Sequence, residues 1–449
     1  MNARMMVILV AIVLAQTFPS TRSEANPMHN RPPEKMSFLQ NETLRIGIDL
    51  NLGGAITYVA DPRDGNNIIN SRDWGRQIQQ SYYCGPTPFG GAHGGWKPWC
   101  WNPIGTGDVY GNPAKVLKSS NDGKTLYIKS IPMQWALDNV PGECTFETWI
   151  TLNGPTAHVR CRLTNDRSDK TQYPAHDQEL PAVYTIGKLY RLMTYDGNAP
   201  FTNAPLRQVE GSSPRWANWK ATENWAALVD DQDRGLGVFH EGVFHFLGGF
   251  HGKVHDGGPL DEPTGYISPT RQEILDANIV YEYRYTLILG KLDQIRQYVY
   301  DHRPPAATPD YRFQQDRQHW SYGNGTTDSG WPIKGMLHVN LDGPSVPTML
   351  GPETFYRATD APRLYLCAAY HTKGKTARLT WRKLGQKPPT DGMTFEINPD
   401  GQTHIYELDL SAGKGYEGII TQLGIDLLTE PGEKGDYVEV YYLSAKRQD

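Results

Sequence analysis

Four consecutive polar residues, His-Asp-Gln-Glu at 176–179, stand directly before an apolar Leu-Pro-Ala-Val run. In an extended strand His176 would lie on one face and Glu179 on the other. A carboxyl or imidazole group held beside apolar residues can have its pKa moved toward neutrality, which general acid–base catalysis needs. Glu179 and His176 are therefore predicted catalytic residues. The alternative is a turn before a strand, in which these groups are solvated.

Three further carboxylates could form a pair with Glu179. Glu223 stands at the start of a predicted strand beside Trp225, a predicted sugar contact, while Asp73 and Asp108 lie in loops. Hydrolysis of a glycosidic bond uses two carboxyl groups, and their separation decides whether the anomeric configuration is retained or inverted. We expect Glu179 or Glu223 to protonate the leaving oxygen. Asp73 or Asp108 would then activate water or attack the anomeric carbon.

A long aromatic, glycine-rich segment spans residues 81–113. Its predicted sugar-binding residues are His93, Trp96, Trp99 and Trp101. The faces of indole rings stack on the C–H faces of sugars, while neighbouring polar groups hydrogen-bond the hydroxyls. Loops of this length in compact domains are usually functional. The alternative is a small aromatic core that fixes the loop.

Arg76 follows Asp73 closely and could bind a substrate carboxylate or sulfate through two hydrogen bonds. The alternative is an ordinary surface ion pair. With Tyr195 or Tyr184 as the base and His176 as its partner, Arg76 would instead suit β-elimination on a uronic-acid polymer, the reaction of a polysaccharide lyase. Tyr184 is also a predicted substrate contact.

Several other chemistries are excluded by the absence of their motifs. The chain has no GxxxxGK[ST] phosphate loop, no GxSxG elbow and no dinucleotide fingerprint. The HEGVFH run at 240–245 has one residue more than the zincin motif, although His251 and His255 follow it and leave a four-histidine metal site as an alternative. We expect no cofactor and no catalytic metal, while a structural calcium ion stays open. The net charge of −5 does not indicate a nucleic-acid partner.

The elements that must position these residues are predominantly strands. The 449 residues include 45 glycines and 33 prolines, which fits many turns between short strands. Only residues 292–302 show helical spacing of apolar residues, and the Pro-rich segment 303–309 follows as a linker. We therefore predict an all-β protein, with a sandwich-type catalytic domain at 37–302 and a β-sandwich or jelly roll at 310–449.

The first residues predict export. A basic start, an eleven-residue apolar run and small residues near position 23 are typical of a signal peptide, predicted at 1–23 and followed by a polar leader at 24–36. No later run is long enough to span a membrane, so we expect a secreted protein, extracellular or periplasmic. In such a compartment we favour disulfides Cys84–Cys100 and Cys144–Cys161 with Cys367 free; the alternative is five buried thiols.

Several runs carry a resemblance to a known class. Residues 53–83, 178–184 and 223–239 look like those of secreted bacterial carbohydrate-active proteins with a galactose-mutarotase-like β-supersandwich. Residues 397–411 and 437–445 are similar to jelly-roll modules of the carbohydrate-binding type. The resemblance implies a polysaccharide or oligosaccharide substrate but does not decide the reaction. We expect a polysaccharide-degrading glycoside hydrolase; the alternatives are the lyase and a glycan-binding protein without catalysis.

Overall fold

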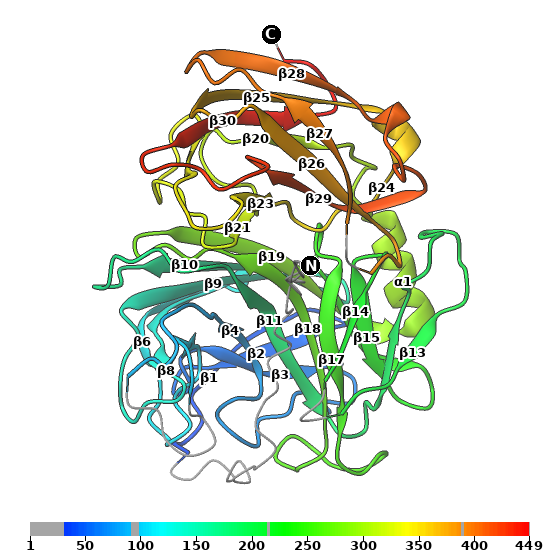
Figure 1. Ribbon diagram of the computed structural model, residues 1–449. Coiled ribbons are helices and arrows are strands. Elements are labelled where there is room, and N and C mark those ends of the chain that lie inside the picture. The colour runs from blue at the N-terminus through cyan, green and yellow to red at the C-terminus, as the bar shows by residue number, and fades with distance from the viewer. Residues whose placement is uncertain (1–30, 91–97, 213–215, 388–389, 449) are drawn as a thin grey trace, which may run out of the picture.

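The computed structural model describes residues 31–90, 98–212, 216–387 and 390–448. The predicted signal peptide and most of the leader lie outside these ranges. Within them the protein is all-β, as predicted: strands build four antiparallel sheets, and the α-helix α1 (Leu292–Asp301) matches the helix expected at 292–302. In Figure 1 the two sheets formed by the later part of the chain lie above the two formed by the earlier part.

Two large sheets form the first sandwich. We call them sheet 1 and sheet 2. Sheet 1 runs in the order β1 (Met36–Gln40), β2 (Arg45–Asp49), β3 (Ala55–Ala60), β4 (Ile78–Ser81), β11 (His176–Ile186), β18 (Thr264–Glu273), β17 (His245–His251), β14 (Ala217–Lys220), with β5 (Pro103–Ile104) beside β4 and β8 (Met133–Gln134) beside β5. Sheet 2 runs in the order β13 (Arg207–Val209), β12 (Arg191–Thr194), β15 (Trp225–Val229), β16 (Arg234–Phe239), β19 (Val280–Lys291), β10 (Thr156–Asn165), β9 (Cys144–Asn153), β7 (Thr125–Ile131), β6 (Lys115–Asn121).

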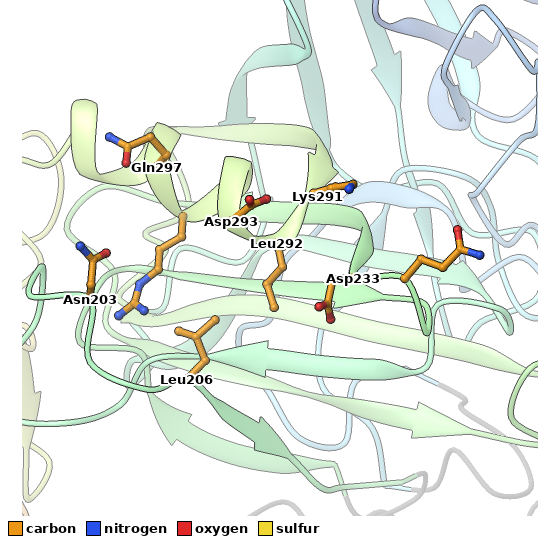
Figure 2. Close-up of a pocket in the computed structure, with 9 residues that line it drawn as sticks. Asn203, Leu206, Asp233, Lys291, Leu292, Asp293 and Gln297 are labelled. Carbon is orange, nitrogen blue, oxygen red and sulfur yellow. The ribbon is translucent and has the colours of Figure 1, made fainter.

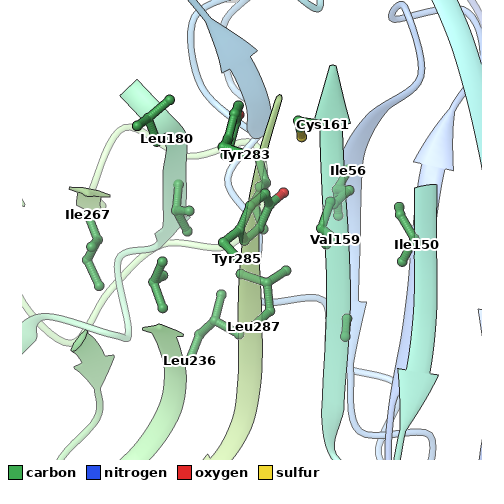
Figure 3. Packing of buried hydrophobic residues seen from close by; sticks show 14 of the residues in the cluster. Ile56, Ile150, Val159, Cys161, Leu180, Leu236, Ile267, Tyr283, Tyr285 and Leu287 are labelled. Atoms are coloured by element: carbon green, nitrogen blue, oxygen red, sulfur yellow. The ribbon is translucent and has the colours of Figure 1, made fainter. Parts of the chain in front are cut away.

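The core of this sandwich fills the space between the two sheets. Figure 3 shows Leu180 and Ile267 from sheet 1 near Tyr285 and Leu287 from sheet 2. Buried and less buried residues alternate along β10, so every second side chain points into this core. The burial of so many apolar side chains is the main stabilising contribution to the sandwich.

Helix α1 covers the outer surface of sheet 2. Its buried residues Leu292, Ile295 and Val299 are spaced three and four apart, so they form one apolar stripe against β15 and β16. Gly237 of β16 makes room for this contact, because a Cβ there would lie 2.5 Å from Cγ2 of Ile295. The described part of the chain holds no helix with the length and apolarity of a membrane span.

The later sheets form a second, smaller sandwich, here called the C-terminal sandwich. One sheet contains β20 (Asp310–Arg312), β30 (Tyr437–Ser444), β25 (Arg363–His371) and β28 (Thr403–Asp409), with β22 (Leu337–Asn340) beside β30. The other contains β21 (Ser321–Gly323), β23 (Thr348–Leu350), β29 (Ile419–Asp426), β26 (Thr376–Lys383) and β27 (Asp391–Glu396), with β24 (Tyr356–Arg357) beside β29. Its assignment to the jelly rolls stays a prediction.

Ion pairs join the C-terminal sandwich to the first one. Arg317 lies 2.6 Å from Asp276, which follows β18, and 2.6 Å from Asp328. Two residues later, His319 lies 2.7 Å from Glu273 at the end of β18. Arg317, Asp276 and Asp328 are buried, and Arg317 bonds to both carboxylates. The end of β18 is therefore held between the two sandwiches.

The predicted disulfides are wrong, because all five cysteines are buried free thiols. In the β9–β10 ladder Cys161 lies opposite Thr148 and Cys144 opposite Asn165. The two cysteines are thus offset by four residues, about 13 Å along the strands, and a disulfide needs Cα atoms within about 7 Å. Cys84 pairs with Trp101 and not with its neighbour Cys100.

Candidate functional site

The outer face of sheet 1, which does not pack on sheet 2, carries a line of polar side chains across five adjacent strands. The strand register pairs Ser81 with Glu179, Glu179 with Thr270, Thr270 with His245, and His245 with Lys220. Residues paired in this way point to the same side of a sheet. We call these five residues the polar row. It brings together side chains from β4, β11, β18, β17 and β14.

Glu179 is the carboxylate of the polar row, and two tyrosine hydroxyls hold it. The hydroxyl of Tyr83 donates to its Oε2 at 3.0 Å, and the hydroxyl of Tyr266 donates to Oε1. Gln178 fixes the backbone of Tyr83 by accepting from its N–H at 2.8 Å and donating to its carbonyl at 2.7 Å. Burial, and then the charge of Glu179, raise the pKa of both tyrosines well above the usual value near 10. Both hydroxyls therefore stay protonated and act as donors.

Three aromatic rings lie side by side on the same face, and we call them the aromatic row. The rings of Tyr184 and Tyr266 are stacked with centroids 4.6 Å apart, and the ring of Trp216 lies 5.1 Å from that of Tyr266. Gly249 stands opposite Tyr266 in the ladder, where a Cβ would lie 3.0 Å from Cε3 of Trp216. The missing side chain makes room for the carbonyl oxygen of Gly211, which a Cβ would approach to 2.2 Å, and also for the ring of Trp216. Rings beside a carboxylate suit the recognition of a sugar.

Among the predicted catalytic residues, Glu179 lies in this site. Among the predicted substrate contacts, Tyr184 lies in it. His176 occupies the opposite face of β11, paired with Glu273, as its strand position indicated. Burial lowers the pKa of His176, so its ring is favoured in the neutral form. Asp177 is exposed and shares the face of Glu179.

Glu223 lies elsewhere, beneath α1, and is fully buried. Its carboxylate accepts hydrogen bonds from Arg296, from the hydroxyl of Tyr300 at 2.8 Å and from the indole of Trp225 at 3.0 Å. Tyr195 is buried in the same region, with the Arg296 guanidinium over its ring. The structure therefore does not bring Glu223, Trp225 or Tyr195 to the outer face of sheet 1, and their contacts favour a structural role.

Asp108 and Asp73 are both committed to local hydrogen bonds. Asp108 is fully buried and accepts from the backbone N–H groups of Tyr110 and Asn112, both at 3.0 Å. Asp73 accepts from two backbone N–H groups and lies 3.0 Å from Nε of Arg76. Burial raises the pKa of Asp73, and the Arg76 charge opposes that effect. Neither carboxylate is paired with Glu179, so the expected pair is not formed by these residues.

The aromatic segment is only partly described. His93 and Trp96 lie outside the described residues. Trp101 belongs to the core of the first sandwich and is 1% exposed, whereas the half-buried Trp99 donates its indole N–H to Asn102 at 3.1 Å. For Trp101, the alternative interpretation of an aromatic core is the one that the structure supports.

Arg76 is buried, so the interpretation as an ordinary surface pair is wrong. Three cationic or titratable side chains, Arg72, Arg76 and His251, converge on the carboxylate of Glu262. The distances to its oxygens are 2.5, 3.4 and 3.2 Å respectively. We call these four residues the cation cluster. It lies beside Tyr184, whose carbonyl accepts from the backbone N–H of Asn70.

The four histidines of 240–255 do not come together. His240 is buried and stacked on Tyr283, His245 is hydrogen-bonded to Asn218, and His255 pairs with Asp231. Among the described residues, no group of three or more potential ligands could hold a metal ion. The four-histidine alternative therefore finds no support in this part of the chain.

A groove of about 550 Å³ lies away from Glu179, beside α1 (Figure 2). Its lining residues are Asn203, Leu206, Gln232, Asp233, Lys291, Leu292, Asp293, Arg296 and Gln297. Arg296 is already bound to Glu223, and Asp233 to Arg191. Two of the charged side chains that line the groove are therefore already paired within the protein.

Sequence reasoning missed Tyr266, Trp216 and His245 as members of this site. The alternation within 264–273 could have assigned Tyr266 to one face of a strand. It could not show that this face is also that of Glu179, because the pairing of β11 with β18 joins segments about ninety residues apart.

No protein-family model matches the chain, and no curated protein matches it either. Solved structures similar to it include a galactose mutarotase-like protein from Lactobacillus casei, with 14% identity and a TM-score of 0.35, covering 57% of this chain and 100% of that one. A galactose mutarotase related enzyme from Lactobacillus acidophilus has 11% identity and a TM-score of 0.34, covering 57% and 97%. The 4-alpha-glucanotransferase from Thermococcus litoralis has 10% identity and a TM-score of 0.33, covering 58% and 40%. Likenesses this distant show nothing about the activity of this protein.

Proposed function

We propose that the protein is a secreted carbohydrate-active enzyme that cleaves glycosidic bonds on the outer face of sheet 1, with Glu179 as its central catalytic residue. One observation carries this proposal: the half-buried Glu179 carboxylate is held by the hydroxyls of Tyr83 and Tyr266, next to a row of aromatic rings. The rings would bind the sugar, and the carboxylate would lie beside the bond that reacts.

In this proposal Glu179 acts as base or nucleophile, and not as the acid that was expected from the sequence. Both of its oxygens accept hydrogen bonds, and neither is engaged by an arginine or lysine among the described residues. Hydrolysis needs a second carboxyl group, and Asp177 is on the same face of β11. Roughly 7 Å separates the Cα atoms of residues two apart in a strand. Asp177 is therefore close enough along the strand to serve as the second carboxyl group of this proposal.

The test is a cleavage assay on neutral, uronic and sulfated polysaccharides with the full mature chain. We expect new reducing ends without ultraviolet absorbance from unsaturated uronides, and we expect Glu179→Gln to abolish them. Glu282→Gln is the matched control, because Glu282 is an exposed glutamate of sheet 2. Absorbance that accompanies the reducing ends would overturn hydrolysis in favour of the lyase. Binding without any cleavage would contradict an enzymatic function and would support the glycan-binding alternative.

Export is a separate part of the proposal and rests on residues 1–23 alone. Expression in a bacterial host followed by mass spectrometry of the exported protein would test it. A mature chain that begins near residue 24 is the expected result. A protein that stays in the cytoplasm with its first residues intact would contradict export.

A further inference from the structure

The cation cluster lies at the end of the aromatic row. His251 of β17 is two residues beyond Gly249, over which Trp216 packs, and so about 7 Å further along the strand. On the other side, Tyr184 donates its backbone N–H to the carbonyl of Gln77, which directly follows Arg76. A chain of sugars lying along the aromatic rings would therefore reach Arg72, Arg76 and His251.

Two carboxylates contact Arg76, namely Glu262 of the cation cluster and Asp73 outside it, and their surroundings differ. Asp73 is buried, accepts from two backbone N–H groups and holds Nε of Arg76, so it is part of the framework. The side chain of Glu262 is 43% exposed and contacts Arg72, Arg76 and His251 through its carboxylate alone. Its backbone carbonyl separately accepts from Nη1 of Arg76 at 2.8 Å, so the backbone is held without the carboxylate.

We propose that Glu262 occupies the place of an anionic substrate group, and that the enzyme acts on an anionic polysaccharide whose carboxylate or sulfate displaces it. This inference rests on the proposed function of the same face. The exchange replaces one anion by another, so the charges of Arg72 and Arg76 stay compensated. Asp73 meanwhile keeps Arg76 oriented. Guanidinium groups bind either oxyanion through charge-assisted hydrogen bonds.

The proposal predicts an unusual gain of binding. Glu262→Gln removes the competing charge while the backbone contact to Arg76 stays, so the affinity for an anionic polymer should rise about tenfold. The affinity for the neutral form of the same polymer should not change. Arg72→Ala should remove the preference for the charged form. A purely structural role for Glu262 predicts the opposite, namely equal or weaker binding.

The experiment measures affinity in the Glu179→Gln background, where cleavage does not interfere. One arm compares polygalacturonate with its methyl ester, and the other compares carrageenan with desulfated carrageenan. Glu433→Gln is the control, because Glu433 is a 65% exposed glutamate paired with Lys373 in the C-terminal sandwich. Preference for a charged polymer, strengthened by Glu262→Gln, supports the proposal, and the arm that responds identifies carboxylate or sulfate.

Two results would overturn the inference without touching the proposed function. The first is equal binding of charged and neutral polymers, and the second is no gain from Glu262→Gln relative to Glu433→Gln. Failure to bind any of the four polymers would also overturn it. The proposed function is decided independently by the cleavage assay with unmodified Glu179.

Discussion

The hydroxyl of Tyr83 lies 3.0 Å from Oε2 of Glu179, although the two residues belong to segments 96 positions apart. This hydrogen bond joins the loop after β4 to β11, and Tyr266 of β18 supplies the second donor to the same carboxylate. Three separate segments of the chain thus meet at one side chain. The position of Glu179 is set by the loop after β4 and by the neighbouring strand β18.

Removing one of these donors should slow the reaction without changing the fold. We expect Tyr83→Phe to lower kcat about tenfold with little change in KM, because one hydrogen bond to a charged group is lost while the aromatic ring remains. Steady-state kinetics on the polysaccharide found in the cleavage assay would measure this. An unchanged kcat would mean that the Tyr83 hydroxyl does not orient the reacting carboxylate.

Glu223 should matter for stability and not for the chemical step. It is fully buried and paired with Arg296, so Glu223→Gln weakens a buried ion pair and leaves the Arg296 charge uncompensated. We expect a loss of about 3–5 kcal/mol in the free energy of unfolding. Urea denaturation measures it, and kcat of the remaining folded protein should be that of the unmodified enzyme. A large fall in kcat without loss of stability would restore Glu223 as a catalytic residue.

The junction between the two sandwiches should weaken in acid. Burial alone would raise the pKa of Glu273, but the charges of His319 and Arg271 outweigh burial and lower it to about 2. A carboxyl group whose pKa is lower in the folded state than in the unfolded state stabilises the folded state. This contribution is present at pH values above the unfolded-state pKa, which is near 4.5. The contribution is lost as the pH falls toward 2.

Urea titrations across this pH range, on unmodified protein and on Glu273→Gln, would test that dependence. We expect the variant to be less stable at neutral pH and to lose less stability between about pH 5 and about pH 2. Glu282→Gln is the control, because its carboxyl group is paired only at the surface with Arg162. Identical pH dependence of Glu273→Gln and the unmodified protein would contradict the ion-pair assignment.

All five cysteines should be free thiols in protein that has not been treated with a reducing agent. Burial raises the pKa of Cys100 and Cys161 to about 12, so almost no thiolate is present at neutral pH. We expect a thiol reagent to modify none of the five in the folded protein and all five in guanidinium chloride. Fewer than five reactive thiols in the denatured, unreduced protein would show that a disulfide exists.

Much of the architecture could be predicted from the residues in order. Alternating polarity and turn residues identify the strands, and the spacing of Leu292, Ile295 and Val299 identifies α1, because these signals are local. The fold class follows from them. Glu179 and Tyr184 could also be proposed, since a polar cluster against an apolar run is visible within one segment.

Only the tertiary structure decided which side chains meet. Glu223 and Asp108 have the same chemistry as Glu179 in the sequence, but the first is neutralised by Arg296 and the second satisfies a turn. Strand register depends on pairings between distant segments, and it alone places Tyr266 beside Glu179. Burial and pairing depend on how the chain packs. The sequence therefore determines which residue types are present, and the tertiary structure determines what each of them does.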